Sequence, residues 1–327
     1  MNTPRSTRRA LLLASLGLAL NAQAQAQSFP NRPVKLIVPY SAGGPVDGVA
    51  RGYAEALSKI WGQPVAVDNK PGANELIAAD LVAKSPADGY TILWGADPTF
   101  STNQFLFKRL PYAQQDLLPV TRVTFVNMAL IVSGNLPVNN MKEFVALIKA
   151  NPGKYNYGSA GNGSAVHVHF DAFLKQEGLQ MQHVAYKGIA PAVQDMLGGQ
   201  IQAMMAGITA ATPYLANGKM KILAVNGAKR AKFVPNVPTF AEAGFPNTES
   251  YFFIGLAVPK GTPRPVLDAI VAANRKVTGD PVFVEKVLDP FAFEPLAETP
   301  EQFAKFLVTD RERAGKKVRD AGARLDP

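Results

Sequence analysis

The chain has 327 residues, of which 47% are hydrophobic and 18% are charged. A chain of this length can bury a large core and favours two domains over one, and its low charge content argues against intrinsic disorder. It carries 34 Lys and Arg against 25 Asp and Glu, a formal net charge of +9, and it has no cysteine. The lack of cysteine excludes disulfides, thiol catalysis, cysteine-bound metals and a lipid-modified N-terminal cysteine.

Residues 1–27 have the layout of a secretory signal peptide. Three arginines form a positive segment, the apolar run ALLLASLGLAL follows, and small residues offer cleavage sites near Ala24 or Ala26. The apolar run is too short to span a membrane. We therefore expect an exported protein whose mature chain begins near residue 28.

Strands and helices are then predicted to alternate. Residues 32–40 (RPVKLIVPY) indicate a buried strand, and residues 41–62 a glycine-rich loop and a helix. Pro45 suits the first turn of that helix, Asp47 suits the positive end of its dipole, and Gly62 suits its end. A second strand, a second helix and the strand GYTILWGA at residues 89–96 follow. This alternation predicts a parallel sheet covered by helices on both faces.

The long β-rich stretch at residues 120–134 predicts a passage into a second α/β unit, and YFFIGLAVPKGTP a passage back. C-terminal helices then complete the first unit. The predicted fold is therefore a hinged clamshell of two α/β lobes. Lobe 1 comprises residues 28–128 and 251–327, and the inserted lobe 2 comprises residues 129–250.

Two glycine-serine loops, YSAGGPV and YGSAGNGS, each connect a strand to a helix, one in each lobe. Such a loop can direct several backbone N–H groups at one anion, and the helix dipole adds positive potential. Ligands of open α/β sheets bind at the carboxyl ends of the strands, so both loops are expected at the cleft. The alternative is that both are ordinary connections whose glycines relieve steric crowding. The candidate donors are Ser41, Ala42, Gly43 and Gly44, and Ser159, Ala160, Gly161, Asn162, Gly163 and Ser164.

Other chemistries find little support in the sequence. The second loop has no G-x-G-x-x-G order and there is no Walker lysine, so no nucleotide cofactor is expected. His167 and His169 point to opposite sides of one helix and cannot chelate one metal, and no serine sits in a G-x-S-x-G elbow. No metal, catalytic residue or nucleic-acid partner is therefore expected. His167, and Asp97 and Thr99 at the end of the strand 89–96, are candidates for the cleft.

The motifs VKLIVPYSAGGPVDGVAR, DNKPGANELIAADLVAKSPADGYTIL, YNYGSAGNGSA, HVAYKGIAPAVQDMLGGQI, VPNVPTFAEAGFP and GLAVPKGTP, in this order, resemble the Bug-type receptors of tripartite tricarboxylate transporters. The resemblance implies a periplasmic type II binding-protein fold that captures an organic carboxylate between its lobes. It also implies delivery to a membrane permease. We expect a monomer that is not an enzyme.

One departure from the family concerns the turn after NKPGA. The family usually continues with glycines, whereas this chain has Asn74 and Glu75, which we include among the predicted ligand-binding residues. They would change the shape and charge of the cleft and so favour a dicarboxylate, a longer or aromatic one included, over a citrate-type solute. Two alternatives stay open: an exported hydrolase or lyase acting on small carboxylates, and a ligand sensor for a membrane histidine kinase.

Overall fold

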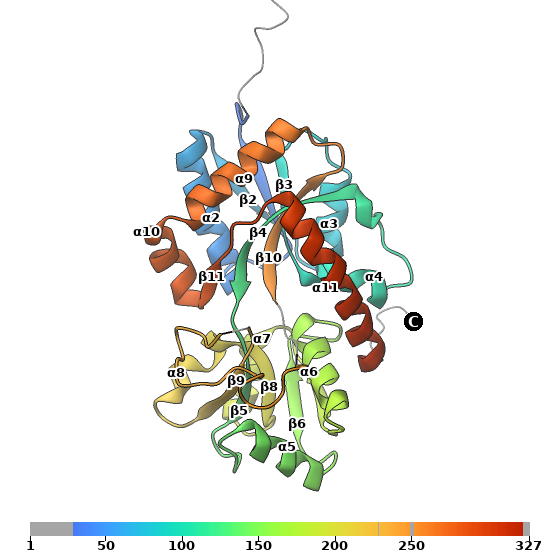
Figure 1. The fold of residues 1–327 in the computed structure, drawn as a ribbon, viewed down its shortest axis with the longest axis vertical. Coiled ribbons are helices and arrows are strands. Elements are labelled where there is room, and N and C mark those ends of the chain that lie inside the picture. Colours follow the sequence, from blue (N-terminus) through green and yellow to red (C-terminus); the bar gives the residue numbers. More distant parts are fainter. Residues whose placement is uncertain (1–28, 228, 249–251, 323–327) are drawn as a thin grey trace, which may run out of the picture.

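The protein folds into two lobes, each built on its own β-sheet, in a computed structural model that describes residues 29–227, 229–248 and 252–322 (Figure 1). The first sheet has the order β11-β4-β10-β3-β1-β2, and the second has the order β7-β6-β8-β5-β9. The predicted two-lobed α/β fold is confirmed. Residues 1–27, which we interpreted as a signal peptide, lie outside the described residues.

The first lobe contains segments from both ends of the chain. Its strands are β1 (Val34–Val38), β2 (Val65–Asn69), β3 (Thr91–Ala96), β4 (Leu117–Val126), β10 (Phe253–Pro259) and β11 (Phe293–Pro295). Its helices are α2 (Pro45–Trp61), α3 (Leu76–Ala83), α4 (Asn103–Leu106), α9 (Arg264–Thr278), α10 (Pro281–Phe283) and α11 (Pro300–Ala321). As predicted, α2 begins at Pro45 and ends before Gly62, which has a left-handed φ of 65°.

The second lobe is formed by the middle of the chain. Its strands are β5 (Met128–Ser133), β6 (Asn156–Ser159), β7 (Gln182–Ala185), β8 (Ala203–Gly207) and β9 (Met220–Val225). Its helices are α5 (Met141–Ala150), α6 (Ala165–Gln176), α7 (Ile189–Leu197) and α8 (Thr212–Leu215).

The parallel pairing predicted for the first three strands is confirmed, but both sheets are mixed. Strand β1 pairs in parallel with β2 and β3, but β10 is antiparallel to both β3 and β4. In the second lobe, β5 is antiparallel to β8 and β9. Strands β4 and β10 carry the chain into the second lobe and back, and they run antiparallel to each other in the first sheet, as β5 and β9 do in the second.

The two passages between the lobes are hydrogen-bonded to each other. Asn127 joins β4 to β5, and its side-chain amide donates to the carbonyl of Ala292 over 3.0 Å. The Met128 N–H donates to Oδ1 of Asn226 on the return passage over 2.9 Å. The sheets thus change at Asn127 and between β9 and β10, and we propose that the lobes divide there. The second predicted boundary, at residues 250 and 251, lies outside the described residues.

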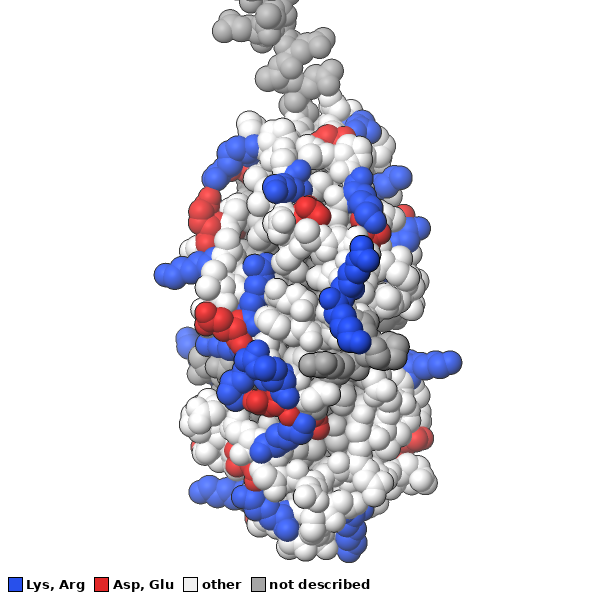
Figure 2. Space-filling model, turned by 90° about the vertical axis from the view of Figure 1, so that its right-hand side faces the viewer, with Lys and Arg blue, Asp and Glu red and all other residues white. Residues whose placement is uncertain are grey.

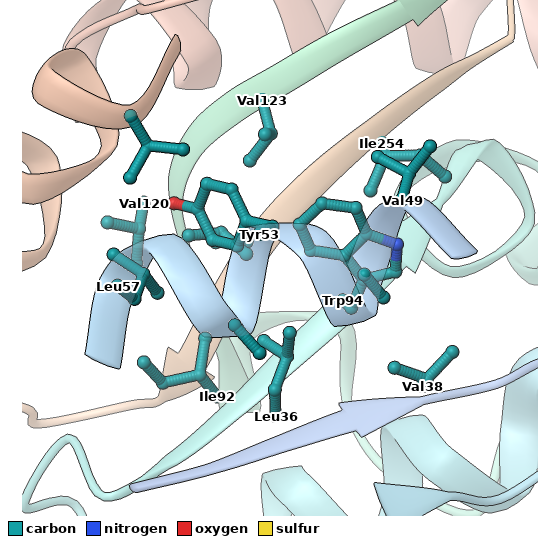
Figure 3. Packing of buried hydrophobic residues seen from close by; sticks show 14 of the residues in the cluster. Leu36, Val38, Val49, Tyr53, Leu57, Ile92, Trp94, Val120, Val123 and Ile254 are labelled. Atoms are coloured by element: carbon teal, nitrogen blue, oxygen red, sulfur yellow. The ribbon is translucent and has the colours of Figure 1, made fainter. Parts of the chain in front are cut away.

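Buried aromatic residues anchor the core of the first lobe (Figure 3). The rings of Tyr53 from α2 and Trp94 from β3 have centroids 5.0 Å apart, and both side chains are fully buried. Within this core, the Tyr53 hydroxyl donates to Oδ1 of Asn274 on α9 over 2.9 Å. This core fixes α2 against the sheet and therefore fixes the loop that precedes α2.

Candidate functional site

The first loop, residues 41–44, leaves the carboxyl end of β1 and enters α2. Gly43 has a φ of 87°, in the left-handed region that favours glycine. Its N–H donates to Oδ2 of Asp47 over 2.9 Å, so this predicted ligand donor is used within the chain. The N–H groups of Ser41, Ala42 and Gly44 have no acceptor among the described residues. They therefore remain available to an anion.

The buried carboxylate of Asp47 is hydrogen-bonded to the first loop. Its side chain is 2% exposed and also accepts hydrogen bonds from Nε of Arg51 over 2.9 Å and from Nδ2 of Asn69 over 2.8 Å. Burial alone would raise the pKa of Asp47, but the hydrogen bonds from Arg51, Gly43 and Asn69 together hold that pKa below its usual value. The carboxylate is thus ionised at neutral pH, next to the positive end of α2.

The second loop, residues 159–164, connects β6 to α6 and is also held internally. The buried hydroxyl of Ser159 accepts the N–H of Gly161 over 3.1 Å, and the N–H of Gly163 donates to Nδ1 of His167 over 3.1 Å. The hydroxyl of Ser164 caps α6 by accepting the N–H of His167. The N–H groups of Ala160 and Asn162 have no acceptor among the described residues, and both residues reach the surface.

A stack of three rings supports the second loop. The ring centroid of His183 lies 4.9 Å from that of Tyr157 and 3.9 Å from that of His167, and the Tyr157 and His167 centroids are 6.4 Å apart. Nε2 of His183 lies 2.7 Å from the Ser159 hydroxyl. Burial, together with the neighbouring His167, lowers the pKa of His183 to about 4, and burial also lowers the pKa of His167. Both rings are therefore neutral at pH 7, which allows Nδ1 of His167 to accept a hydrogen bond.

The sequence analysis did not identify His183 and Tyr157 as residues that support the second loop. Their proximity follows only from the strand pairing, because the register of β6 and β7 places Tyr157 directly opposite His183. Nothing in the sequence predicts that β7 lies at the edge next to β6.

The turn at residues 72–75, predicted to line the cleft, places Glu75 in the interior. Its side chain is 4% exposed, and its carboxylate accepts hydrogen bonds from Thr99 Oγ1 over 2.6 Å, from Ala96 N–H over 3.1 Å and from the Tyr40 hydroxyl. Burial raises the pKa of Glu75 against the opposing effect of these hydrogen bonds. The carboxylate of Glu75 and the hydroxyl of Thr99 thus bond to each other. Ligand contact by either residue stays a prediction, and this geometry favours a supporting role for both.

Asn74 occupies a different position, at the boundary between the lobes. Its Nδ2 donates to Oδ1 of Asn103 over 2.8 Å, and Nδ2 of Asn103 donates back to the carbonyl of Asn74 over 2.7 Å. The same Nδ2 of Asn74 lies 3.5 Å from the carbonyl oxygen of Gly163 in the second loop. Asn74 therefore brings the turn of lobe 1 to the loop of lobe 2.

Asp97 lies in a small cavity of about 10 Å³, lined by Asp97, Thr102, Val168, His169, Asp310, Ala314 and Lys317. No residue of either glycine-serine loop lines this cavity. Asp97 accepts a hydrogen bond from Oγ1 of Thr102 over 2.6 Å. Burial, followed by the nearby Asp310 carboxylate, raises the pKa of Asp97 to about 7. The structure thus places Asp97 where α11 meets α6, apart from the two loops.

The regions that flank the two glycine-serine loops pack together at the boundary between the lobes. Ala160 of the second loop and Val166 at the start of α6 pack in the same apolar cluster as Val46 and Val49 of α2. Apolar contacts therefore join the regions that flank the two loops, and ligand contact by the loop residues stays a prediction.

Neither a metal site nor a membrane-spanning helix is found among the described residues. Within the described residues, no group of three or more His, Cys, Asp or Glu gathers as a metal site. None of the described helices has the length and apolar character needed to cross a bilayer.

Acidic and basic side chains are interspersed over both lobes on the face that Figure 2 shows. The basic helix α11 contributes ion pairs such as Lys316 with Asp320.

Two solved structures are similar to this chain over almost their whole length. Rpa4515 of R. palustris, solved with adipate, is 31% identical with a TM-score of 0.81, and the match covers 91% of this chain and 100% of the other. MatC from Rhodopseudomonas palustris, solved with bound malate, is 29% identical with a TM-score of 0.77, and the match covers 89% and 100%.

Sequence comparison agrees with the structural likeness. The "UPF0065 protein in gbd 5'region" of Cupriavidus necator is 36% identical over 301 residues, which cover 90% of this chain and 89% of the relative. Protein BugT of Bordetella pertussis is 32% identical over 320 residues, or 96% of each chain. The model for the tripartite tricarboxylate transporter family receptor matches residues 49–323. The chain therefore belongs to the Bug-type receptors of the tripartite tricarboxylate transporter family, which are periplasmic solute-binding proteins and not enzymes.

Proposed function

We propose that this receptor binds an organic dicarboxylate between its lobes, with one carboxylate at each glycine-serine loop. The observation that carries the proposal is that each lobe has one such loop in front of a helix, with N–H groups that have no acceptor in the part of the chain that the structure describes. Ser41, Ala42 and Gly44 offer these groups in the first lobe, and Ala160 and Asn162 offer them in the second. Backbone N–H groups at a helix N-terminus are a common carboxylate site.

The strength of such a site is sufficient for a transport receptor. Neither loop contains Lys or Arg, so affinity must come from hydrogen bonds and helix dipoles. A hydrogen bond to a charged group contributes about 1.5–3 kcal/mol, and micromolar affinity requires about 8 kcal/mol. Four or five such bonds meet that requirement. Adipate and malate, present in the two similar structures, each carry two carboxylates, and this supports a dicarboxylate ligand here.

We further propose that the protein works as a monomer that passes its ligand to the permease subunits of a tripartite transporter. The family match supports a partnership with a membrane transporter. Cleavage after Ala24 or Ala26 would release the receptor into the periplasm. Longer and aromatic dicarboxylates are included among the candidate ligands because Asn74 and Glu75 alter the turn beside the cleft.

The ligand class can be tested by thermal shift and then by calorimetry on the mature protein. The panel contains acetate, malate, adipate, phthalate, terephthalate and citrate. A ligand at 100 times its Kd adds about 2.7 kcal/mol of stability, which a melting curve resolves. We expect one or more dicarboxylates to raise the melting temperature and acetate to leave it unchanged. If no dicarboxylate binds, and mass spectrometry of the denatured protein finds no co-purified one, the proposal is wrong.

The two-loop arrangement has a separate test in paired glycine variants. Gly43 and Gly62 both have positive φ, and a β-carbon at either position would meet no atom within 4 Å. Ala at either site therefore introduces similar backbone strain, but only Gly43 lies in the first loop. Gly161→Ala in the second loop has Gly244→Ala as its control, since the two glycines have φ values of 126° and 97° and a β-carbon at either position would come no closer than 3.4 Å to a neighbouring atom. We expect weaker dicarboxylate binding in the Gly43 and Gly161 variants. Equal affinity in all four variants would contradict the two-loop site.

A further inference from the structure

The turn at residues 72–75 has a backbone conformation that L-amino acids rarely adopt. Gly72, Ala73, Asn74 and Glu75 have φ values of 119°, 46°, 50° and 75°. Non-glycine residues usually visit the left-handed region singly, because the β-carbon then crowds a carbonyl oxygen. Three in succession persist only where the surroundings hold them, and such strain concentrates at binding sites and switches. The position of this turn at the boundary between the lobes agrees with that pattern.

The carboxylate of Glu75 fixes the turn to the first lobe. It accepts hydrogen bonds from Ala96 and Thr99, which lie at and just beyond the end of β3, and from Tyr40, the residue before the first loop. Because the side chain is buried, these bonds are shielded from competing water. Glu75 thus connects the strained turn to two segments at the carboxyl ends of the strands. The Glu75 carboxylate therefore lies beside the proposed carboxylate site while its own hydrogen bonds are made within the first lobe.

Asn74 is the residue that the strained turn presents to the other lobe. Its side-chain amide is oriented by the hydrogen bond to Oδ1 of Asn103, and Nδ2 of the fully buried Asn103 holds the main-chain carbonyl of Asn74. The amide nitrogen of Asn74 lies 3.5 Å from the carbonyl oxygen of Gly163, at the long limit of a hydrogen bond. A small closing movement of the lobes would shorten this distance to that of a normal hydrogen bond.

We propose that Asn74 is a closure contact of the receptor, whose amide bonds to the Gly163 carbonyl when the lobes close on a ligand. Glu75 is a positioning residue that keeps Asn74 in its left-handed conformation. This inference rests on the proposed function, because it assigns the regulation of the same cleft. The contact stabilises the closed form and therefore slows the release of the ligand, while the association rate, which is set in the open form, stays unchanged.

The test is Asn74→Gly, which removes the amide and relieves the strain, since glycine accepts positive φ freely. Stopped-flow measurements with adipate should show dissociation about tenfold faster, as expected for the loss of one hydrogen bond, with an unchanged association rate. The strain that glycine relieves offsets the cost of leaving Oδ1 of the buried Asn103 without its donor, so the melting temperature without ligand should change by only a few degrees. The control is Asn151→Gly at the end of α5, where the side chain donates to the carbonyl of Leu147 over 2.9 Å and the φ of −135° leaves no strain for glycine to relieve. It should release adipate at the wild-type rate.

A second measurement does not depend on the ligand. The chain has no cysteine, so Lys59→Cys on α2 and Lys149→Cys on α5 can carry one spin label on each lobe. Pulsed electron paramagnetic resonance then gives the distances between the lobes. We expect the Asn74→Gly protein to populate longer distances than the unsubstituted protein, both with and without adipate. Identical distance distributions, or identical adipate release, would overturn the closure contact. If the unsubstituted protein binds no dicarboxylate, the proposed function fails, and the ligand-free distances still decide the role of Asn74.

Glu75 is tested by comparing two substitutions. Glu75→Ala removes the carboxylate that accepts from Ala96, Thr99 and Tyr40, whereas Glu75→Gln keeps an oxygen for Ala96 and Thr99. We expect Glu75→Ala to release adipate as fast as Asn74→Gly, and Glu75→Gln to restore part of the slow release. In a combined Asn74→Gly and Glu75→Ala protein, release should be no faster than with Asn74→Gly alone, because Glu75 acts through Asn74. Additive effects on the release rate would refute this positioning role.

Discussion

Removal of the Ser159 hydroxyl should loosen the second loop, because this hydroxyl holds the loop by hydrogen bonds while the glycines of the loop stay in place. This oxygen accepts the Gly161 N–H over 3.1 Å, donates to the Gly161 carbonyl over 3.1 Å and lies 2.7 Å from Nε2 of His183. The side chain is fully buried, so water does not replace it in the folded protein. Ser159→Ala therefore leaves the Gly161 N–H and a ring nitrogen of His183 without their partner.

The size of the effect follows from these contacts. An unpaired buried polar group costs about 1–3 kcal/mol, and with an unfolding entropy of about 2.1 cal/mol/K per residue, 1 kcal/mol lowers the melting temperature of a chain of about 300 residues by about 1.6 °C. We therefore expect a decrease of roughly 2–5 °C for Ser159→Ala. A loop that is no longer held in its binding shape must be ordered by the ligand, so the Kd for adipate should rise about tenfold.

Calorimetry and thermal melting on Ser159→Ala and on a matched serine variant provide the assay. Ser58 is the control, because its hydroxyl donates to Ala54 over 2.8 Å and accepts from Val65 over 2.9 Å, at the end of α2 opposite to the first loop. Ser58→Ala should melt lower but bind adipate normally. The reasoning is refuted if Ser159→Ala melts lower and still binds adipate with unchanged affinity, because the second loop would then not be the ligand site.

Two further predictions concern pH and the core. The pKa values of His167 and His183 are lowered on folding, so the unfolded chain binds more protons. The stability that these rings contribute should be complete above pH 6.5 and lost as the pH falls toward about 4. Melting curves in that pH range measure this loss, and the pH dependence of the melting temperature should be weaker in a His183→Asn protein. Tyr53→Phe leaves Oδ1 of Asn274 without its donor and should reduce the free energy of unfolding by about 1–3 kcal/mol in urea, with normal adipate binding.

The parts of the fold that could be predicted are those determined by local chemistry. Pro45, Asp47 and Gly62 mark the start, the first turn and the end of α2 by conformational preferences that act within a few residues. The two glycine-serine loops were recognisable for the same reason, since the positive φ of Gly43 and Gly161 requires glycine. The alternation of strands and helices likewise predicted two α/β lobes.

What could not be predicted depends on contacts between distant segments. The interior position of Glu75 follows from partners at the ends of two other strands, Tyr40 and Thr99, and a charged residue in a turn is ordinarily expected to face solvent. The ring stack requires the register of β6 and β7, which no local pattern specifies. The internal hydrogen bonds of the Gly43 and Gly163 N–H groups are local, because their acceptors Asp47 and His167 lie four residues later, but the sequence does not show which way these two side chains turn.

The two loops also differ in the charge that supports them, and this difference bears on how each would hold an anion. The first loop precedes a helix whose positive end already faces the ionised Asp47. The second precedes α6, whose start is capped by the neutral hydroxyl of Ser164, and the Gly163 N–H is accepted by a neutral imidazole. A fixed negative charge reduces the positive potential that a helix offers to a ligand. A carboxylate at the first loop must therefore rely on directional hydrogen bonds, whereas one at the second also gains from the dipole of α6. For this reason the strain introduced at Gly43 and at Gly161 should weaken binding to different extents, and the variant of the first loop should lose more, because the dipole of α6 does not depend on the exact geometry of the second loop.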